Sequence, residues 1–401
     1  MSVESPRSTE RAPAVVQVER ALAAAAERGA SDVHLEPTAA GYELRYRIDG
    51  LLQPGEPIDA DQGRAMVSRL MVLAGLLTYR RDVPQEGRMT MAIPANAAAL
   101  SMRVAVMPTT HGLRAVVRMP AELTQPRELA GLGLPAAAER SLRRFAGRDA
   151  GLLLLTGPAG SGKTTTIYAL LEHVIATQPG LSIVTLEEPV ERDLVGVTQV
   201  QVEPFGAMTY ERALPSVLRQ DPQVLMIGEI RTAATASLAV QAALSGHRTI
   251  STLHAGSAAG AIARLLEMGI EPYQITSALF GVVNQRLVRT SNPDAVGGTI
   301  DARANARGYA GRAPVAEVAE MGGDLRQAIL ERADLDRLAS VIAARPAHQS
   351  LRDSAEALLA TGRTDEAELR RVLGGAGRAV DEPGVGSGPD PEGTHGDGGA
   401  S

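Results

Sequence analysis

The segment GPAGSGKT at residues 157–164 restricts the fold of this chain more than any other part of its sequence. It has the spacing G-x-x-x-x-G-K-T, follows the apolar run LLLLT, and precedes a stretch with helical spacing that reaches about Gln178. Such a loop lets backbone N–H groups surround phosphate oxygens at the positive end of a helix. Because strand and helix supply the context that this motif requires, we predict an α/β domain built around a phosphate loop.

The loop predicts ATP and Mg²⁺ as the bound cofactors. The Lys163 ammonium is expected to reach the β and γ phosphates, and the Thr164 hydroxyl to take a place on Mg²⁺. A chance match or a decayed site is the alternative, and the flanking strand and helix weigh against it. The residues expected to contact the nucleotide are Gly157, Pro158, Ala159, Gly160, Ser161, Gly162, Lys163, Thr164 and Thr165.

A second apolar strand, VLMIGEIR at 224–231, ends in a carboxylate. In a parallel sheet covered on both faces, the carboxyl ends of the strands meet the ligand at one edge. Glu229 is therefore the candidate general base, which would orient and deprotonate the attacking water. A surface glutamate at a strand end would be the ordinary interpretation if no phosphate loop were present.

Further polar residues follow other predicted strands of this sheet. Glu187 and Glu188 lie in TLEEPVE, and His254 lies in STLHAG, with His247 seven residues earlier. Each is weak evidence alone, since paired glutamates are usually solvated and a histidine is more often structural than catalytic. Their predicted convergence on one edge makes Glu187 and Glu188, with Thr164, the candidate Mg²⁺ residues and His254 a candidate γ-phosphate sensor.

Composition excludes several classes of protein. The 401 residues contain no cysteine, so disulfides and thiolate metal sites are excluded, and we expect no zinc. The net charge of −6 argues against a nucleic-acid-coating surface, and nucleic acid is not expected as a direct partner. No apolar run resembles a leader or a membrane span, so we expect a cytoplasmic protein.

The pattern of the chain predicts two domains. Residues 14–119 combine helical spacing with short alternating segments and predict a small α+β domain. Residues 120–135, rich in proline and glycine, predict a linker. Residues 136–373 predict the phosphate-loop domain with a helical C-terminal part, and residues 374–401 have the composition of a disordered tail.

Taken together, these segments resemble the ATPases of bacterial type II secretion and type IV pilus assembly. The segments that carry the resemblance are ASDVHLEP at 30–37, RYRIDG at 45–50, VPQEGR at 83–88, GPAGSGKTTTIY at 157–168, TLEEPVE at 185–191, LRQDPQVLMIGEIR at 218–231 and SGHRTISTLHAG at 245–256. SDVHLEP, RYRIDG and GYAGRAPVAEV at 308–318 favour the assembly and secretion branch over the retraction branch. The similarity spans about residues 15–320.

The resemblance implies a homo-hexameric motor in which a PAS-like N-terminal domain packs against a RecA-like ATPase domain. It implies work at the inner face of the cell membrane, on a membrane platform protein of a secretion or pilus system. It also implies that arginines of the first domain complete the site, and Arg103 and Arg118, with Arg88 as a third, are the candidates. Basic residues that merely solvate a sheet face are the alternative for each.

Several positions depart from the family pattern. Glu188 stands where aspartate is usual, Leu113 where glutamate is usual, and Thr232 and Ala234 where acidic residues are usual. The sequence NQRLVRTSNPD at 284–294 lacks the four cysteines that many members carry there, and the additional N-terminal docking module is not seen in these 401 residues. We expect these departures to alter metal contacts and the surface used for docking.

Pro215 occupies a position where the resemblance leads us to expect an arginine. If a helix begins near Tyr210 with Thr209 as N-cap, Pro215 lies inside it; if a helix restarts at Pro215, its backbone is unstrained. Either way a positive charge four residues before Arg219 is missing, and Arg212 is a possible substitute.

The motor hypothesis has two alternatives. One is a related ring that moves DNA or another macromolecule or retracts a filament. The other is a nucleotide-binding structural subunit with little turnover, which Pro215 favours and which Lys163, Thr164 and Glu229 oppose.

Overall fold

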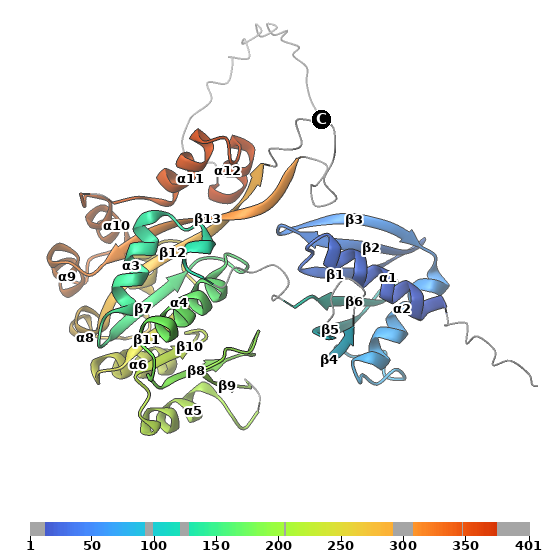
Figure 1. Ribbon diagram of the computed structural model, residues 1–401, viewed down its shortest axis with the longest axis horizontal. Helices are drawn as coiled ribbons and strands as arrows, with labels where there is room; N and C mark the ends of the chain where they lie inside the picture. Colours follow the sequence, from blue (N-terminus) through green and yellow to red (C-terminus); the bar gives the residue numbers. More distant parts are fainter. Residues whose placement is uncertain are drawn as a thin grey trace, which may run out of the picture.

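A computed structural model describes residues 13–92, 99–120, 128–203, 206–291, 308–346 and 348–374. It contains two sheets that lie side by side, the N-terminal one in blue to teal and the larger one in green to orange (Figure 1). The predicted tail from residue 375 onward and the middle of the predicted linker, residues 121–127, lie outside the described residues. No helix in the described ranges is long and apolar enough to cross a membrane.

The N-terminal sheet has six antiparallel strands in the order β3-β2-β1-β6-β5-β4. Its elements are α1 (Pro13–Glu27), β1 (Asp32–Thr38), β2 (Gly41–Ile48), β3 (Leu51–Ile58), α2 (Ala60–Leu73), β4 (Gln85–Ala92), β5 (Ala99–Thr109) and β6 (Gly112–Arg118). Alternate residues of β5 are buried, as expected of a strand with one face on the core. The apolar sides of α1 and α2 cover that face, so this is the predicted small α+β unit.

The larger sheet has the order β13-β12-β7-β11-β10-β8-β9, in which only β13 is antiparallel to its neighbour. Its strands are β7 (Gly151–Thr156), β8 (Ile183–Glu187), β9 (Thr198–Gln201), β10 (Val224–Ile227), β11 (Arg248–Leu253), β12 (Leu279–Ser291) and β13 (Tyr309–Glu320). The predicted parallel α/β sheet is confirmed. The long β12–β13 pair was not predicted as strands from periodicity.

Helices cover both faces of the larger sheet. They are α3 (Ala136–Ala146), α4 (Lys163–Thr177), α5 (Tyr210–Val217), α6 (Ala233–Leu244), α7 (Ala258–Glu267), α8 (Pro272–Ala278), α9 (Gly323–Leu330), α10 (Leu335–Ala343), α11 (Leu351–Ala360) and α12 (Glu366–Leu373), with short 3₁₀ turns at Ala130–Leu132 and Leu218–Gln220. Leu153 and Leu155 pack with α3 and α4, whereas Leu152 and Leu154 pack on the opposite face with α6 and α7. This explains why the strands read as continuous apolar runs.

Helix boundaries follow local signals. The first helix ends at Glu27, and Gly29 after it has a left-handed φ of +62°, which is common just past the C-terminus of a helix. The second helix, α2, ends at Leu73, two residues before Gly75, which takes a left-handed φ of +68°. Pro215 lies inside α5, whose N-cap is Thr209, so the restart of a helix at Pro215 is not seen.

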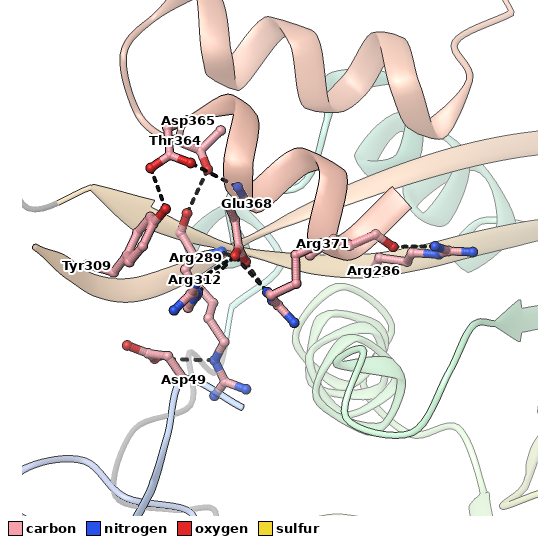
Figure 2. Close-up of polar contacts among 10 residues, drawn as sticks. Asp49, Arg286, Arg289, Tyr309, Arg312, Thr364, Asp365, Glu368 and Arg371 are labelled. Carbon is pink, nitrogen blue, oxygen red and sulfur yellow. Dashed lines mark hydrogen bonds and ion pairs between the residues drawn. The ribbon is translucent and has the colours of Figure 1, made fainter. Parts of the chain in front are cut away.

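Contacts made by two residues, Asp49 and Arg88, join the N-terminal unit to the larger sheet. Asp49, in the turn between β2 and β3, accepts a hydrogen bond from the Gly311 amide on β13 (3.0 Å). It also pairs with Arg312 on the same strand (3.5 Å), as Figure 2 shows. Arg88 on β4 donates to Gln201 at the end of β9 (2.9 Å). The turn that contains Asp49 therefore meets one edge strand of the sheet and β4 meets the other.

The last helix is fastened to β12 by a buried carboxylate. Glu368 on α12 is 0% exposed and accepts hydrogen bonds from Arg289 and Arg371 at 2.6 Å each, as Figure 2 shows. Burial by itself would raise the pKa of the Glu368 carboxyl, but the bonds from Arg371 and Arg289 lower that pKa to about 2. The helical C-terminal part is thus held to the sheet through a charged contact as well as an apolar one.

Candidate active site

The phosphate loop lies between β7 and α4, at the carboxyl edge of the parallel sheet. Gly157, Gly160 and Gly162 have φ of +135°, +73° and +87°, conformations that favour glycine. A Cβ atom at Gly157 would lie 2.2 Å from the backbone oxygen of Gln285, so that position has no room for a side chain. The predicted strand, loop and helix are therefore in place, with Lys163 as the first residue of α4.

The geometry of the loop suits a phosphate group. The buried Ser161 hydroxyl oxygen has no hydrogen-bond partner among the described residues. The first-turn N–H groups of α4 have no acceptor within their own helix, as at every helix start. Donors without partners beside glycines that keep the backbone open form a cradle for an anion. The predicted contacts Pro158, Ala159, Thr164 and Thr165 belong to this same segment.

Lys163 is folded back onto the loop. Its Nζ atom donates to the carbonyl oxygens of Gly157 (2.8 Å) and Pro158 (2.9 Å). Burial lowers the pKa of the Lys163 ammonium, and the negative charge of Glu229 opposes that shift. Glu229 thus lies close enough to the phosphate loop to act on its lysine electrostatically, although the two residues are 66 positions apart in the numbering.

Three predicted site residues, Glu188, Glu229 and His254, lie together at the edge of the sheet, and Glu229 follows β10. His254 Nε2, after β11, lies 2.7 Å from one Glu229 oxygen, and Arg231 donates to the other at 2.8 Å. Arg231 also donates to Glu188 at 2.9 Å. Glu188, Glu229 and His254 come from the ends of three adjacent strands, as their predicted convergence required. Arg231 joins the two carboxylates, and we did not single it out from the sequence.

Glu187 lies elsewhere, although it is adjacent to Glu188. It is 3% exposed, accepts from Thr185 (2.6 Å) and Gln199 (3.0 Å), and bonds the Tyr168 hydroxyl. Burial, followed by the Glu187 charge, raises the pKa of Tyr168. Glu187, the last residue of β8, therefore links α4 to β8 and β9 inside the protein. The structure does not bring it to the group formed by Glu188 and Glu229.

The three predicted arginines form a row across the N-terminal sheet. Arg88, Arg103 and Arg118 are cross-strand neighbours on β4, β5 and β6. Like charges in such register are unfavourable, and Arg118 finds a counter-charge in Asp32 at 3.2 Å. Partial burial, then the charges of Arg88 and Arg118, lower the pKa of Arg103. The positive charges of Arg103 and Arg118 also act on Glu191, three residues after Glu188.

Other residues near the site had weaker or no sequence signals. Tyr210 begins α5, and its hydroxyl lies so close to Gly228 that a Cβ there would approach it to 2.7 Å. Burial, then the charge of Glu188, raises the pKa of Tyr210. His247 lies before β11, at the opposite end of the strand from His254, with Nδ1 2.9 Å from the Ala242 carbonyl. His247 is therefore not part of this site.

A parallel sheet covered on both faces, a phosphate loop and strand-end carboxylates together define a RecA-like P-loop ATPase fold. The family described as "Type II/IV secretion system protein" matches residues 7–371. The chain therefore belongs to the family of type II and type IV secretion ATPases, as its motifs indicated.

Individual relatives agree with this assignment. "Type II secretion system ATPase E" of Vibrio cholerae is 42% identical over 287 residues, which cover 72% of this chain and 56% of the relative. "Type II secretion system protein HxcR" of Pseudomonas aeruginosa is 37% identical and covers 90% of this chain and 77% of its own length. "Type IV pilus assembly ATPase PilB" of Thermus thermophilus is 38% identical, covering 72% of this chain and 32% of the relative. The chain thus spans little more than half of the Vibrio protein.

Solved structures share the fold. The ATPase DotB of Legionella pneumophila superposes with a TM-score of 0.70 at 21% identity, covering 92% of this chain and 98% of that one. The pilus retraction motor PilT with bound ADP superposes with a TM-score of 0.61 at 24% identity, covering 91% and 97%. At these identities the likeness concerns the fold alone.

Proposed function

We propose that this chain hydrolyses ATP and works as a homo-hexameric motor. The work would be assembly of pilin-like filaments for protein secretion, type IV pilus extension or DNA uptake. The observation that carries the proposal is the position of Glu229 at the edge of the sheet, paired with His254 and acting on the phosphate-loop lysine. The names of the curated relatives, secretion ATPase and pilus assembly ATPase, support the direction of that work.

Each residue of the candidate site has its own role in the proposed hydrolysis of ATP. Lys163 leaves the loop carbonyls and places its charge on the β and γ phosphates when ATP binds. Glu229 accepts a proton from the attacking water, and His254 fixes the orientation of that carboxylate. Arg231 holds Glu188 and Glu229 together, so both keep their positions as charge moves toward the β phosphate.

Oxygen ligands of the kind that Mg²⁺ prefers are present in the site. Thr164 and Glu188 would hold Mg²⁺ on the nucleotide, and the ion would neutralise charge on the phosphate oxygens. We do not assign Glu187 to the metal, because its carboxylate is taken up by Tyr168, Thr185 and Gln199. We expect no bound zinc, since the chain has no cysteine.

The arginine row would complete the site between subunits or domains. Arg103 and Arg118 carry charges that a γ phosphate would attract, and a guanidinium can bind two of its oxygens at once. The partner of the assembled ring would be a membrane platform protein at the inner face of the cell membrane. The relatives named for type II secretion and type IV pilus assembly support a partner from one of these systems.

Steady-state phosphate release by the purified chain in Mg²⁺ and ATP tests the proposal. We expect turnover that is lost in Lys163→Ala, with size-exclusion chromatography and light scattering to report ring formation. Nucleotide binding without phosphate release, in protein that has assembled into hexamers, would overturn the motor and favour the low-turnover structural subunit.

A further inference from the structure

Asn284 and Gln285 are consecutive residues in the middle of β12, where β7 ends. Asn284 pairs with both β7 and β13, and Gln285 pairs with β13. Their exposed fractions are 0% and 2%. Burying a side-chain amide without partners is costly, so two in succession at the centre of a sheet require satisfied hydrogen bonds. Their partners are the two loops that bracket the candidate active site.

Gln285 holds the phosphate loop. Its Nε2 atom donates to the carbonyl of Ser161 (2.8 Å), and its Oε1 atom accepts from the Thr166 hydroxyl on the first turn of α4 (2.9 Å). The backbone oxygen of Gln285 also lies against Gly157. One residue of β12 therefore contacts the beginning and the middle of the phosphate loop and the first turn of the helix that follows it.

Asn284 holds the loop that follows His254. Its Oδ1 atom accepts from Thr156, the last residue of β7 (3.3 Å), and its Nδ2 atom donates to the carbonyl of Gly256 (3.0 Å). Nδ2 also lies 3.5 Å from Glu317 on β13, which accepts from the amide of Ala258 at 3.0 Å. The segment from 254 to 258 is thereby tied to the sheet at two points.

The alternation of a strand places the two amides on opposite faces. Val283 belongs to the apolar cluster of α3 and α4, and Val282 to the cluster of α6 and α7. Two residues later in each case, Gln285 lies on the α4 face and Asn284 on the α7 face. A single rigid strand thus reaches the phosphate loop on one side and the His254 loop on the other.

We propose that Asn284 and Gln285 are positioning residues. They hold the phosphate loop and the His254–Glu229 pair at the relative positions that hydrolysis requires. The inference rests on the proposed function and adds two residues to it. Gln285 acts through the loop that binds the phosphates, so it governs nucleotide affinity. Asn284 acts through the loop that places His254 on Glu229, so it governs the rate of the chemical step.

Two substitutions that replace the side-chain amide with an apolar group separate these roles in the full chain. Gln285→Met removes both hydrogen bonds of the side-chain amide. The Ser161 carbonyl then loses its donor, and the Thr166 hydroxyl loses its acceptor. Asn284→Leu does the same to Thr156 and Gly256. Val288→Ala is the control, because Val288 is a buried β12 residue that packs against Ala313 and Val315, away from both loops. Affinity is measured with a fluorescent ATP analogue, and kcat by phosphate release.

We expect Gln285→Met to weaken binding of the analogue about tenfold with kcat within about twofold, and Asn284→Leu to lower kcat about tenfold at nearly unchanged affinity. Amide hydrogen exchange should rise in residues 157–164 for the first variant and in 254–258 for the second. Val288→Ala should change neither parameter by more than about twofold. Equal effects of both variants on both parameters, or effects no larger than the control, would overturn the proposal.

Failure of the proposed function and failure of the positioning roles would give different experimental results. Wild-type protein that binds the analogue and releases no phosphate would contradict the motor while the affinity and exchange measurements still decide the positioning roles. Unchanged exchange in both loops of the two variants would refute the positioning roles even in a protein with normal turnover.

Discussion

The Nε2 atom of His254 lies 2.7 Å from the Oε1 atom of Glu229. The two residues follow adjacent strands, β11 and β10, and meet because those strands are parallel and paired in register. Glu229 is largely enclosed, whereas the His254 side chain is 59% exposed. A carboxylate held from one side by a histidine and from the other by Arg231 keeps a fixed orientation toward the phosphate loop.

Lys163 and Glu229 should fail in different ways when substituted. Lys163→Ala is expected to remove most nucleotide affinity, because the ammonium that balances the phosphate charge is gone. Glu229→Gln is expected to keep affinity within a few-fold and to lower kcat about 100-fold or more, because only proton acceptance is lost. Analogue binding and phosphate release on the two variants check this. A comparable loss of binding in both would contradict the roles assigned.

Substitution of an arginine in the row formed by Arg88, Arg103 and Arg118 should lower kcat more than it lowers the affinity for ATP. Arg103→Ala and Arg118→Ala are each expected to lower kcat at least about tenfold, since a guanidinium on the γ phosphate acts mainly in the transition state. Arg20→Ala, which removes an exposed arginine from α1, is the control for net charge. Rates of all three variants at saturating ATP decide the point. Turnover equal to the control would mean that the row only solvates the sheet.

Pro215 lies inside α5, and two substitutions there can separate the effect of the missing backbone N–H from the effect of the missing positive charge. Pro215→Ala restores the missing N–H donor, and Pro215→Arg restores the donor and adds the absent charge. Both are expected to raise Tm, because proline in a helix interior costs up to about 3 kcal/mol. Only the arginine variant is expected to raise the basal rate, several-fold. Unchanged turnover in folded, equally oligomeric Pro215→Arg protein would make Pro215 a local backbone variation or show that Arg212 compensates.

Glu368 predicts an acid-sensitive contact between α12 and β12 (Figure 2). Its folded pKa of about 2 lies below the ordinary 4.5, so its stabilisation is complete above about pH 4.5 and is lost as the pH falls toward 2. That shift corresponds to about 3 kcal/mol of unfolding free energy at neutral pH. Glu368→Gln should therefore unfold at lower urea at pH 7, and the difference from wild type should shrink by more than half at pH 3.

The neighbouring Glu366 gives the matched control for this measurement. It is exposed on the same helix and faces Arg370 at 3.7 Å. Because exposed ion pairs contribute at most about 1 kcal/mol, Glu366→Gln should unfold close to wild type at both pH values. A Glu368→Gln difference that is the same at pH 7 and pH 3 would refute the carboxylate's role.

Much of this protein was predictable because its signals are local in the chain. The phosphate loop is a spacing of eight residues, and the glycines that its backbone requires are part of that spacing. The parallel sheet was predicted from continuous apolar strands between helices, and the position of Glu229 from the rule that carboxyl ends of such strands share an edge. The order of these segments also identified the family.

Tertiary structure decided which of two adjacent carboxylates belongs with the site. Glu187 and Glu188 are neighbours in sequence, yet the end of a strand turns one into the interior and the other toward Arg231. It also decided the roles of Asn284, Gln285 and Glu368. Their partners lie 128, 124 and 79 residues away, at Thr156, Ser161 and Arg289 respectively. Periodicity and spacing report only neighbours along the chain, so contacts made by strand pairing and helix packing appear only when the chain is folded.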